Sequence, residues 1–155
     1  MHIVYSDQHR RHDPSGYISR GRIVPSAECP EHADRLIKAL HQAGHEDTGP
    51  RDHGLGPLAA IHSPDYLDFL MHGHAAWTAQ PDTGPEIIAN AHPGRNVLTR
   101  PEGIVGLAGY HMADTACPIG AGTWQAAHAS AQVALTAADA VIEGAQAAYA
   151  LCRPP

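Results

Sequence analysis

The chain has 155 residues, of which 43% are hydrophobic, and its formal net charge at pH 7 is −6. This length and composition suit one domain with an apolar core and exclude a fully disordered chain. The acidic balance argues against a general nucleic-acid binder, and the longest apolar run is too short for a membrane span. We expect no signal peptide in MHIVYSDQHR, and the three scattered cysteines fit a reducing cytoplasm.

The first third of the chain is predicted to form a strand, a loop and a helix. Residues 2–6 are apolar and β-branched, which favours a short strand. Residues 7–29 contain several prolines and glycines and are expected to form a long loop, a type of segment that is often functional. Pro30 is expected to open a helix that runs to about Ala43, and Gly44 ends it.

The middle of the chain is predicted to contain short helices and a second long segment, residues 80–122, here called the excursion. A short helix is expected at 57–60, and Ser63 is expected to cap a helix that begins at Pro64 and ends near Met71. Residues 80–122 are rich in glycine and proline but also carry many apolar side chains. Because a linker would be more polar, we expect this excursion to pack as part of the domain.

The last part is predicted to be a long helix followed by a strand. Thr123 is expected to cap an alanine-rich helix that runs to about Glu143, with Gly144 ending it. Residues 147–152 form a continuous apolar run, which is typical of a fully buried, parallel strand. Sites in α/β proteins lie at the carboxyl ends of such strands, so a site is expected just where this sequence stops.

Histidine is unusually frequent, with 13 residues. Three local pairs have a spacing that suits metal ligands: His9 and His12, His41 and His45, and His72 and His74. Two arginines beside the first pair oppose a cation, glycines interrupt the other two pairs, and neither CxxC nor HExxH occurs. We therefore expect mostly solvated surface histidines near helix ends, and keep a histidine-rich metal-binding domain as a third hypothesis.

Five segments, in chain order, have a combination of motifs typical of one family: IVYSDQHRRHDP, VPSAECPEHADRLIKAL, IHSPDYLDFL, GYHMADTACPIGAGTWQAAHASAQVAL and AAYALCRPP. They resemble the N-terminal part of the histone deacetylase superfamily, in its bacterial acetylpolyamine amidohydrolase-like branch. The last of them is the most specific, because in this family Arg-Pro-Pro runs directly into Gly-His-His-Ala.

The resemblance implies an α/β domain of the arginase/deacetylase type, with a mostly parallel sheet flanked by helices. Residues 1–155 would be the N-terminal part of that single domain, with an entrance loop at about 7–29 and a dimer-type insertion at about 80–122. In this family, zinc held by Asp, His and Asp polarises the acetyl carbonyl and a water, a His-His pair moves protons, and a Tyr stabilises the oxyanion. All of these residues would follow Pro155, so we expect no catalytic or metal-binding residue here, no specific zinc binding and an inactive chain.

Four residues are candidates for the substrate entrance: Asp13, Glu28, Arg153 and Pro155. Glu28 has an alternative role, because a carboxylate ahead of a helix stabilises its N-terminus. His32 stands where the family's helix start usually has arginine, which puts an ion pair at that position in question.

The resemblance also implies substrates and partners for the full-length enzyme. The substrate would be a small acetylated amine, such as an acetylpolyamine or an acetyl-lysine-like amine, and the enzyme would be a cytoplasmic homodimer joined through 80–122, with no nucleic-acid or membrane partner. The segment 10–27 carries four arginines and one acid, the opposite sign to the acidic entrance that attracts polyamines. The alternative is a non-catalytic, partner-binding truncated homologue.

Overall fold

The computed structural model describes residues 1–94 and 99–154, so Pro155 lies outside the described residues. The chain divides into two compact units. The first consists of Met1–Asp13, Glu28–Ile61 and Gly122–Pro155, and the second of Pro14–Ala27 and His62–Ala121. Among the described residues, none of the helices combines the length and apolarity needed to cross a bilayer.

A parallel sheet forms the centre of the first unit. It has the strand order β4-β1-β5, in which β1 is His2–Val4, β4 is Asp47–Thr48 and β5 is Ala148–Ala150. Both neighbours run parallel to β1. The strands predicted at 2–6 and 147–152 are confirmed, although β5 is half-buried and not fully buried, because it forms an edge of the described sheet. The strand β4 is not predicted by the sequence pattern.

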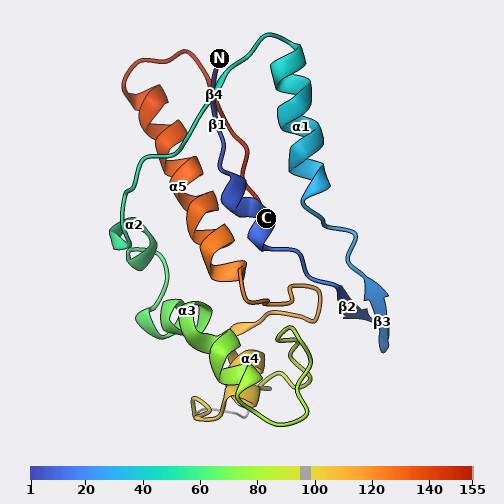
Figure 1. Cartoon of the computed structure of the whole chain (residues 1–155). Helices are drawn as coiled ribbons and strands as arrows, with labels where there is room; N and C mark the ends of the chain where they lie inside the picture. Colours follow the sequence, from blue (N-terminus) through green and yellow to red (C-terminus); the bar gives the residue numbers. More distant parts are fainter. Residues whose placement is uncertain (95–98, 155) are drawn as a thin grey trace. The chain divides into compact units, whose positions relative to one another are not determined.

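Two helices of the first unit cover opposite faces of this sheet, and the strands run between them in Figure 1. The helix α1 spans Glu31–Gln42, as Pro30 and Gly44 predicted, and α5 spans Thr123–Ile142. A third helix, α2, is the short piece Gly56–Ala59.

Successive residues of β1 supply the two cores, since side chains alternate between the faces of a strand. Ile3 packs towards α1 and Val4 packs towards α5, and both are 2% exposed or less. The α1 side contains Ile3, Ala33, Ile37 and Leu151, and the α5 side contains Val4, Val133 and Ala137.

The start of α5 differs from the prediction. Gly122 is the N-cap and Thr123 is already the first helical residue, with no side-chain capping bond at this terminus. Gly122 is required by packing, because a Cβ at this position would clash with the backbone carbonyl of Arg11. The other end agrees with the sequence, since Gly144 adopts φ +108° directly after the helix.

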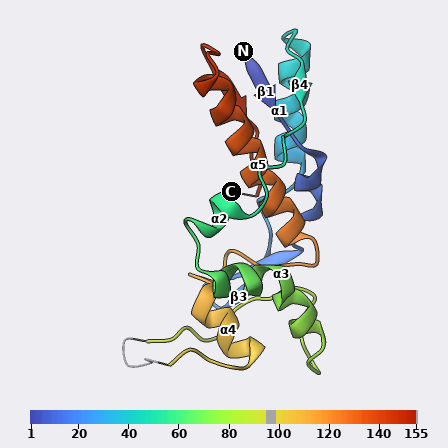
Figure 2. The same ribbon diagram turned by 90° about the vertical axis from the view of Figure 1, so that its left-hand side faces the viewer.

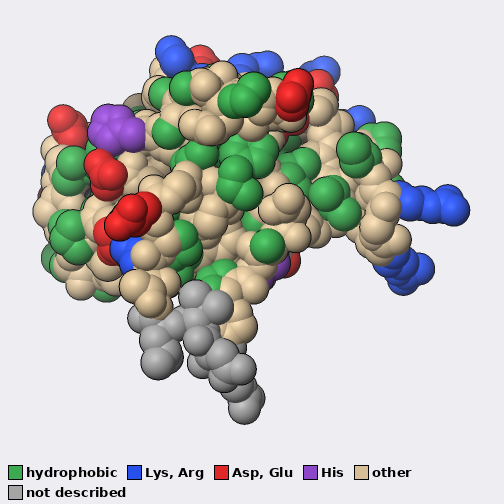
Figure 3. Space-filling view, turned by 90° about the horizontal axis from the view of Figure 1, so that it is seen from below, with side chains coloured by type: hydrophobic (Ala, Val, Ile, Leu, Met, Phe, Trp, Pro, Cys, Tyr) green, Lys and Arg blue, Asp and Glu red, His purple; other side chains and the backbone are tan. Residues whose placement is uncertain are grey.

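The predicted loop 7–29 contains regular structure. Asp7–Arg11 forms a 3-10 helix, η1, which belongs to the first unit. In the second unit, β2 (Gly16–Ser19) and β3 (Arg22–Pro25) form an antiparallel hairpin. The prediction of a loop was therefore wrong for this part of 7–29. The tight turn between the strands is made by Arg20 and Gly21, which adopt φ values of 52° and 75°. Lys and Arg side chains project from the right-hand edge of the space-filling view in Figure 3.

The second unit is built around α3 (Pro64–Thr78) and α4 (Ile104–His111), which lie side by side in Figures 1 and 2. The helix α3 begins after Ser63 as predicted but continues past Met71, because Gly73 packs against the Phe69 ring and does not end it. The excursion 80–122 includes α4. It packs as predicted, since its apolar residues form a buried core with α3: Phe69, Ile87, Ala89, Ile104, Ala108, Met112 and Ile119.

Candidate functional site

A buried arginine links segments of the first unit that are far apart in the sequence. Arg153 follows β5, and its side chain is 3% exposed. Its Nη1 donates to the carbonyl oxygens of His9 and His12, at 2.7 and 2.6 Å. Its Nε donates to the carboxylate of Glu28. One guanidinium therefore joins the end of β5, η1 and the segment that precedes α1, through short charge-assisted bonds.

Glu28 is the anionic partner of this arginine. Its second carboxylate oxygen lies 2.9 Å from Nδ1 of His32, so His32 forms the type of pair that the sequence left in question. Burial alone would raise the pKa of Glu28, but the hydrogen bonds from His32 and Arg153 outweigh it and lower the pKa. Glu28 is thus an ionised link between α1 and Arg153.

The two histidines of η1 and its C-cap are buried, which corrects the expectation of solvated surface side chains. His9 is 2% exposed and its Nε2 lies 2.8 Å from the Tyr5 hydroxyl. His12 is 8% exposed and its Nδ1 lies 2.9 Å from Oγ1 of Thr123. Burial lowers the pKa of both imidazoles, and the positive charge of Arg153 lowers it further. Both rings are therefore suited to remain neutral while they anchor η1.

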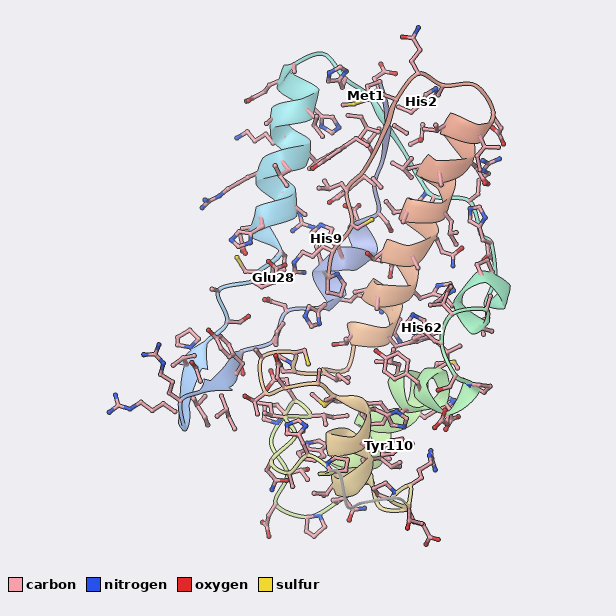
Figure 4. All side chains as sticks on the ribbon, turned by 180° about the vertical axis from the view of Figure 1, so that it is seen from behind. Met1, His2, His9, Glu28, His62 and Tyr110 are labelled. Carbon is pink, nitrogen blue, oxygen red and sulfur yellow. The ribbon has the colours of Figure 1, made fainter. Side chains whose placement is uncertain are left out.

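Figure 4 labels His9 and Glu28, which approach each other from η1 and from the segment before α1. Asp34 of α1 adds to this network, with a carboxylate oxygen 2.6 Å from Nη2 of Arg10 and 3.6 Å from Nε2 of His9. The Tyr5 hydroxyl completes it, and burial together with the nearby Asp7 carboxylate raises the pKa of Tyr5 to about 12. The residues on the carboxyl side of β1 are thus held by polar contacts on several sides.

The structure brings two of the four candidate entrance residues together. Glu28 and Arg153 form the pair described above, whereas Asp13 is exposed, where the chain leaves the first unit. Pro155 lies outside the described residues. The sequence indicates His9 and His12 only as a possible ligand pair and Thr123 only as a helix cap, and it does not predict that these side chains are buried or that His12 meets Thr123. The available signal was weak: His9 and His12 are three residues apart, which is one turn of a 3-10 helix.

The fit of a metal ion can be tested on the donors present. No group of three or more His, Cys, Asp or Glu side chains within residues 1–94 and 99–154 is placed to hold a metal ion. The histidines that meet carboxylates do so singly, as His41 does with Asp47 at 2.6 Å and His72 with Asp68 at 3.8 Å. The described donors do not fit a zinc site, so no catalytic step through zinc can be built from them.

The comparison with models of protein families identifies the family of this chain. The model of the histone deacetylase domain matches residues 26–155. The chain belongs to the histone deacetylase family. This confirms the resemblance to the family, and both Glu28 and Arg153 lie inside the matched residues.

Relatives within this family carry the name of one enzyme. An acetylpolyamine amidohydrolase of Burkholderia pseudomallei is 46% identical over 93% of this chain and 42% of its own length. Acetylpolyamine amidohydrolase 1 of Pseudomonas aeruginosa is 42% identical over 100% of this chain and 46% of its own length. The chain therefore spans less than half the length of these relatives.

A solved structure confirms the fold class. The crystal structure of acetylpolyamine aminohydrolase from Burkholderia pseudomallei, from an iodide soak, matches with a TM-score of 0.93 and 44% identity. The match covers 100% of this chain and 45% of that one. The α/β architecture, with its parallel sheet and flanking helices, thus corresponds to part of a known amidohydrolase.

Proposed function

We propose that this sequence forms the N-terminal part of an amidohydrolase that removes acetyl groups from small acetylated amines. The observation that carries the proposal is the similarity, at 34–46% identity over 93–100% of the chain, to four proteins named as acetylpolyamine amidohydrolases. In this proposal residues 1–155 belong to a single deacetylase domain, with the entrance loop at 7–29 and the insertion at 80–122 joining two subunits.

The chain's own contribution is structural support at the edge of the active site. Glu28 and Arg153 brace the segments that leave β1 and β5, and Asp13 and Pro155 are assigned to the neighbouring entrance. Zinc, when held by the rest of the enzyme, supplies a Lewis acid for the acetyl carbonyl. Because the described donors form no metal site, the 155-residue chain is proposed to be inactive when expressed by itself.

Charge on the proposed entrance loop supports a narrower substrate class. Arg10 is neutralised by Asp34, with 2.6 Å between Nη2 and the carboxylate oxygen, whereas Arg20 and Arg22 at the hairpin are exposed. Exposed cations repel a polyamine. A substrate with one amine, or an acetyl-lysine-like amine, therefore suits this loop better than a long polycation.

The test is deacetylation by the complete product of the gene, supplied with zinc and compared with the 155-residue chain. Acetate release from N1-acetylspermine, which keeps three charged amines, and from an acetyl-lysine peptide is measured for both. We expect turnover by the complete product, none by the chain, and a preference for acetyl-lysine that weakens when Arg20 and Arg22 are changed to Gln. No acetate release by the complete product overturns the proposal, as does turnover by the chain.

A further inference from the structure

Two segments leave the sheet of the first unit at the same edge. The strands β1 and β5 are parallel neighbours, with His2 opposite Ala148 and Val4 opposite Ala150. The residues that follow them, η1 and 151–154, therefore emerge side by side at the carboxyl edge. Ligand sites of open α/β sheets lie outside this edge, so the relative position of these two segments sets the geometry of whatever site forms there.

Arg153 fixes that relative position. Its Nη1 holds two carbonyl oxygens of the segment after β1, while its own backbone belongs to the segment after β5. Backbone carbonyls cannot move independently of the chain, so these bonds fix the path of η1 more firmly than a contact between two side chains does. The planar guanidinium holds its donors in a rigid fork, which a lysine cannot reproduce.

The arginine is not a surface residue that reaches a substrate. Its side chain is 3% exposed, and its Nε is bound to Glu28. Its Nη2 is buried and has no hydrogen-bond acceptor among the described residues. A buried donor of this kind calls for an acceptor, so one further group is expected to meet Arg153 at this edge.

We propose that Arg153 is a positioning residue of the amidohydrolase, which sets the spacing between the segments after β1 and β5 and acts on the reaction through them. The inference rests on the proposed function and changes the role of Arg153 from an entrance contact to an internal brace. Misplacement of site groups by about 1 Å lowers turnover on the order of 100-fold. The effect is therefore expected in kcat and not in substrate binding.

The test compares two arginine-to-lysine variants of the complete gene product on an acetylated amine. R153K is expected to lower kcat about 10- to 100-fold and to change KM less than about threefold. The matched control is R51K, since Arg51 is 50% exposed and pairs on the surface with Asp139 and Glu143. The control is expected to keep both constants within about twofold. A folded R153K variant with unchanged kcat overturns the proposal.

A double variant and an independent readout complete the test. Because Glu28 and Arg153 act as one unit, E28Q is expected to lower kcat further by less than about twofold in the R153K background. The His12 amide donates to the His9 carbonyl that Arg153 also binds, so its hydrogen exchange is expected to accelerate about tenfold in R153K and not in R51K. If the wild type hydrolyses no acetylated amine, only the proposed function fails. Equal exchange in R153K and wild type overturns the positioning role in either case.

Discussion

Truncation of Ile87 tests whether the insertion is a packed core. Ile87 is 0% exposed and lies among the buried residues of the second unit. Changing it to Ala removes three carbon atoms, and about 0.8 kcal/mol for each gives a transfer loss of about 2.4 kcal/mol. The cavity left behind raises the loss in the free energy of unfolding to about 3–4 kcal/mol. Its two backbone bonds to Ile119, at 2.8 and 3.1 Å, do not involve the side chain.

The assay is urea unfolding followed by tryptophan fluorescence. Trp77 packs against the same core, so a W124F background isolates its signal. With a slope of about 2 kcal/mol per molar urea, the midpoint is expected to fall by about 1.5–2 M. The control is Ile61→Ala, which removes the same atoms from a side chain that is 81% exposed and is expected to cost less than about 0.5 kcal/mol. A loss below about 1 kcal/mol for Ile87→Ala, or equal losses for both variants, would refute the reasoning.

Three further predictions concern the first unit. Gly122→Ala is expected to lower the melting temperature by several degrees, since the new Cβ meets the Arg11 carbonyl, and an unchanged melt contradicts this close approach. His9 and His12 have a pKa below the ordinary 6.5, so the unfolded state binds protons first and stability falls as the pH drops below about 6.5. Melting temperatures between pH 8 and 5 measure this slope, and H12Q is expected to flatten it. The pKa of Tyr5 is raised to about 12, so its neutral form is favoured in the fold and stability falls as the pH rises above 10. Tyrosine ionisation is followed by ultraviolet absorbance as the pH rises, and Y5F is expected to lose part of the absorbance change near pH 12. The same absorbance change in Y5F and wild type would count against the burial of this hydroxyl.

Local patterns predicted the elements that carry clear signals in their own segment of sequence. Pro30 and Gly44 located α1, and the apolar run after Gly144 located β5. The hairpin at residues 16–25 was missed because its turn uses Arg20 at positive φ, a conformation that is more usual for Gly or Asn. Prolines and glycines therefore indicated a loop where the chain forms two paired strands.

The contacts of the candidate site also could not be predicted from local sequence patterns. Glu28 and Arg153 were both selected from the sequence, but their contact joins residues 125 apart, and the bond to the His9 carbonyl joins residues 144 apart. Spacing along the chain carries no information on such pairs. The burial of His9 and His12 also depends on α5, which packs against η1 from the other end of the sequence. Only the assembled fold shows that these histidines are internal anchors.

The strand order β4-β1-β5 has a consequence for synthesis. The first strand made, β1, finds one neighbour at Asp47–Thr48, but its other neighbour is Ala148–Ala150, nearly the whole chain later. While the ribosome adds the residues between them, one edge of β1 has no paired strand and the apolar side chain of Val4 is not yet covered by α5. Pairings this distant in sequence form slowly and leave nascent chains prone to association. The nascent protein is therefore expected to be prone to association until β5 has left the ribosome.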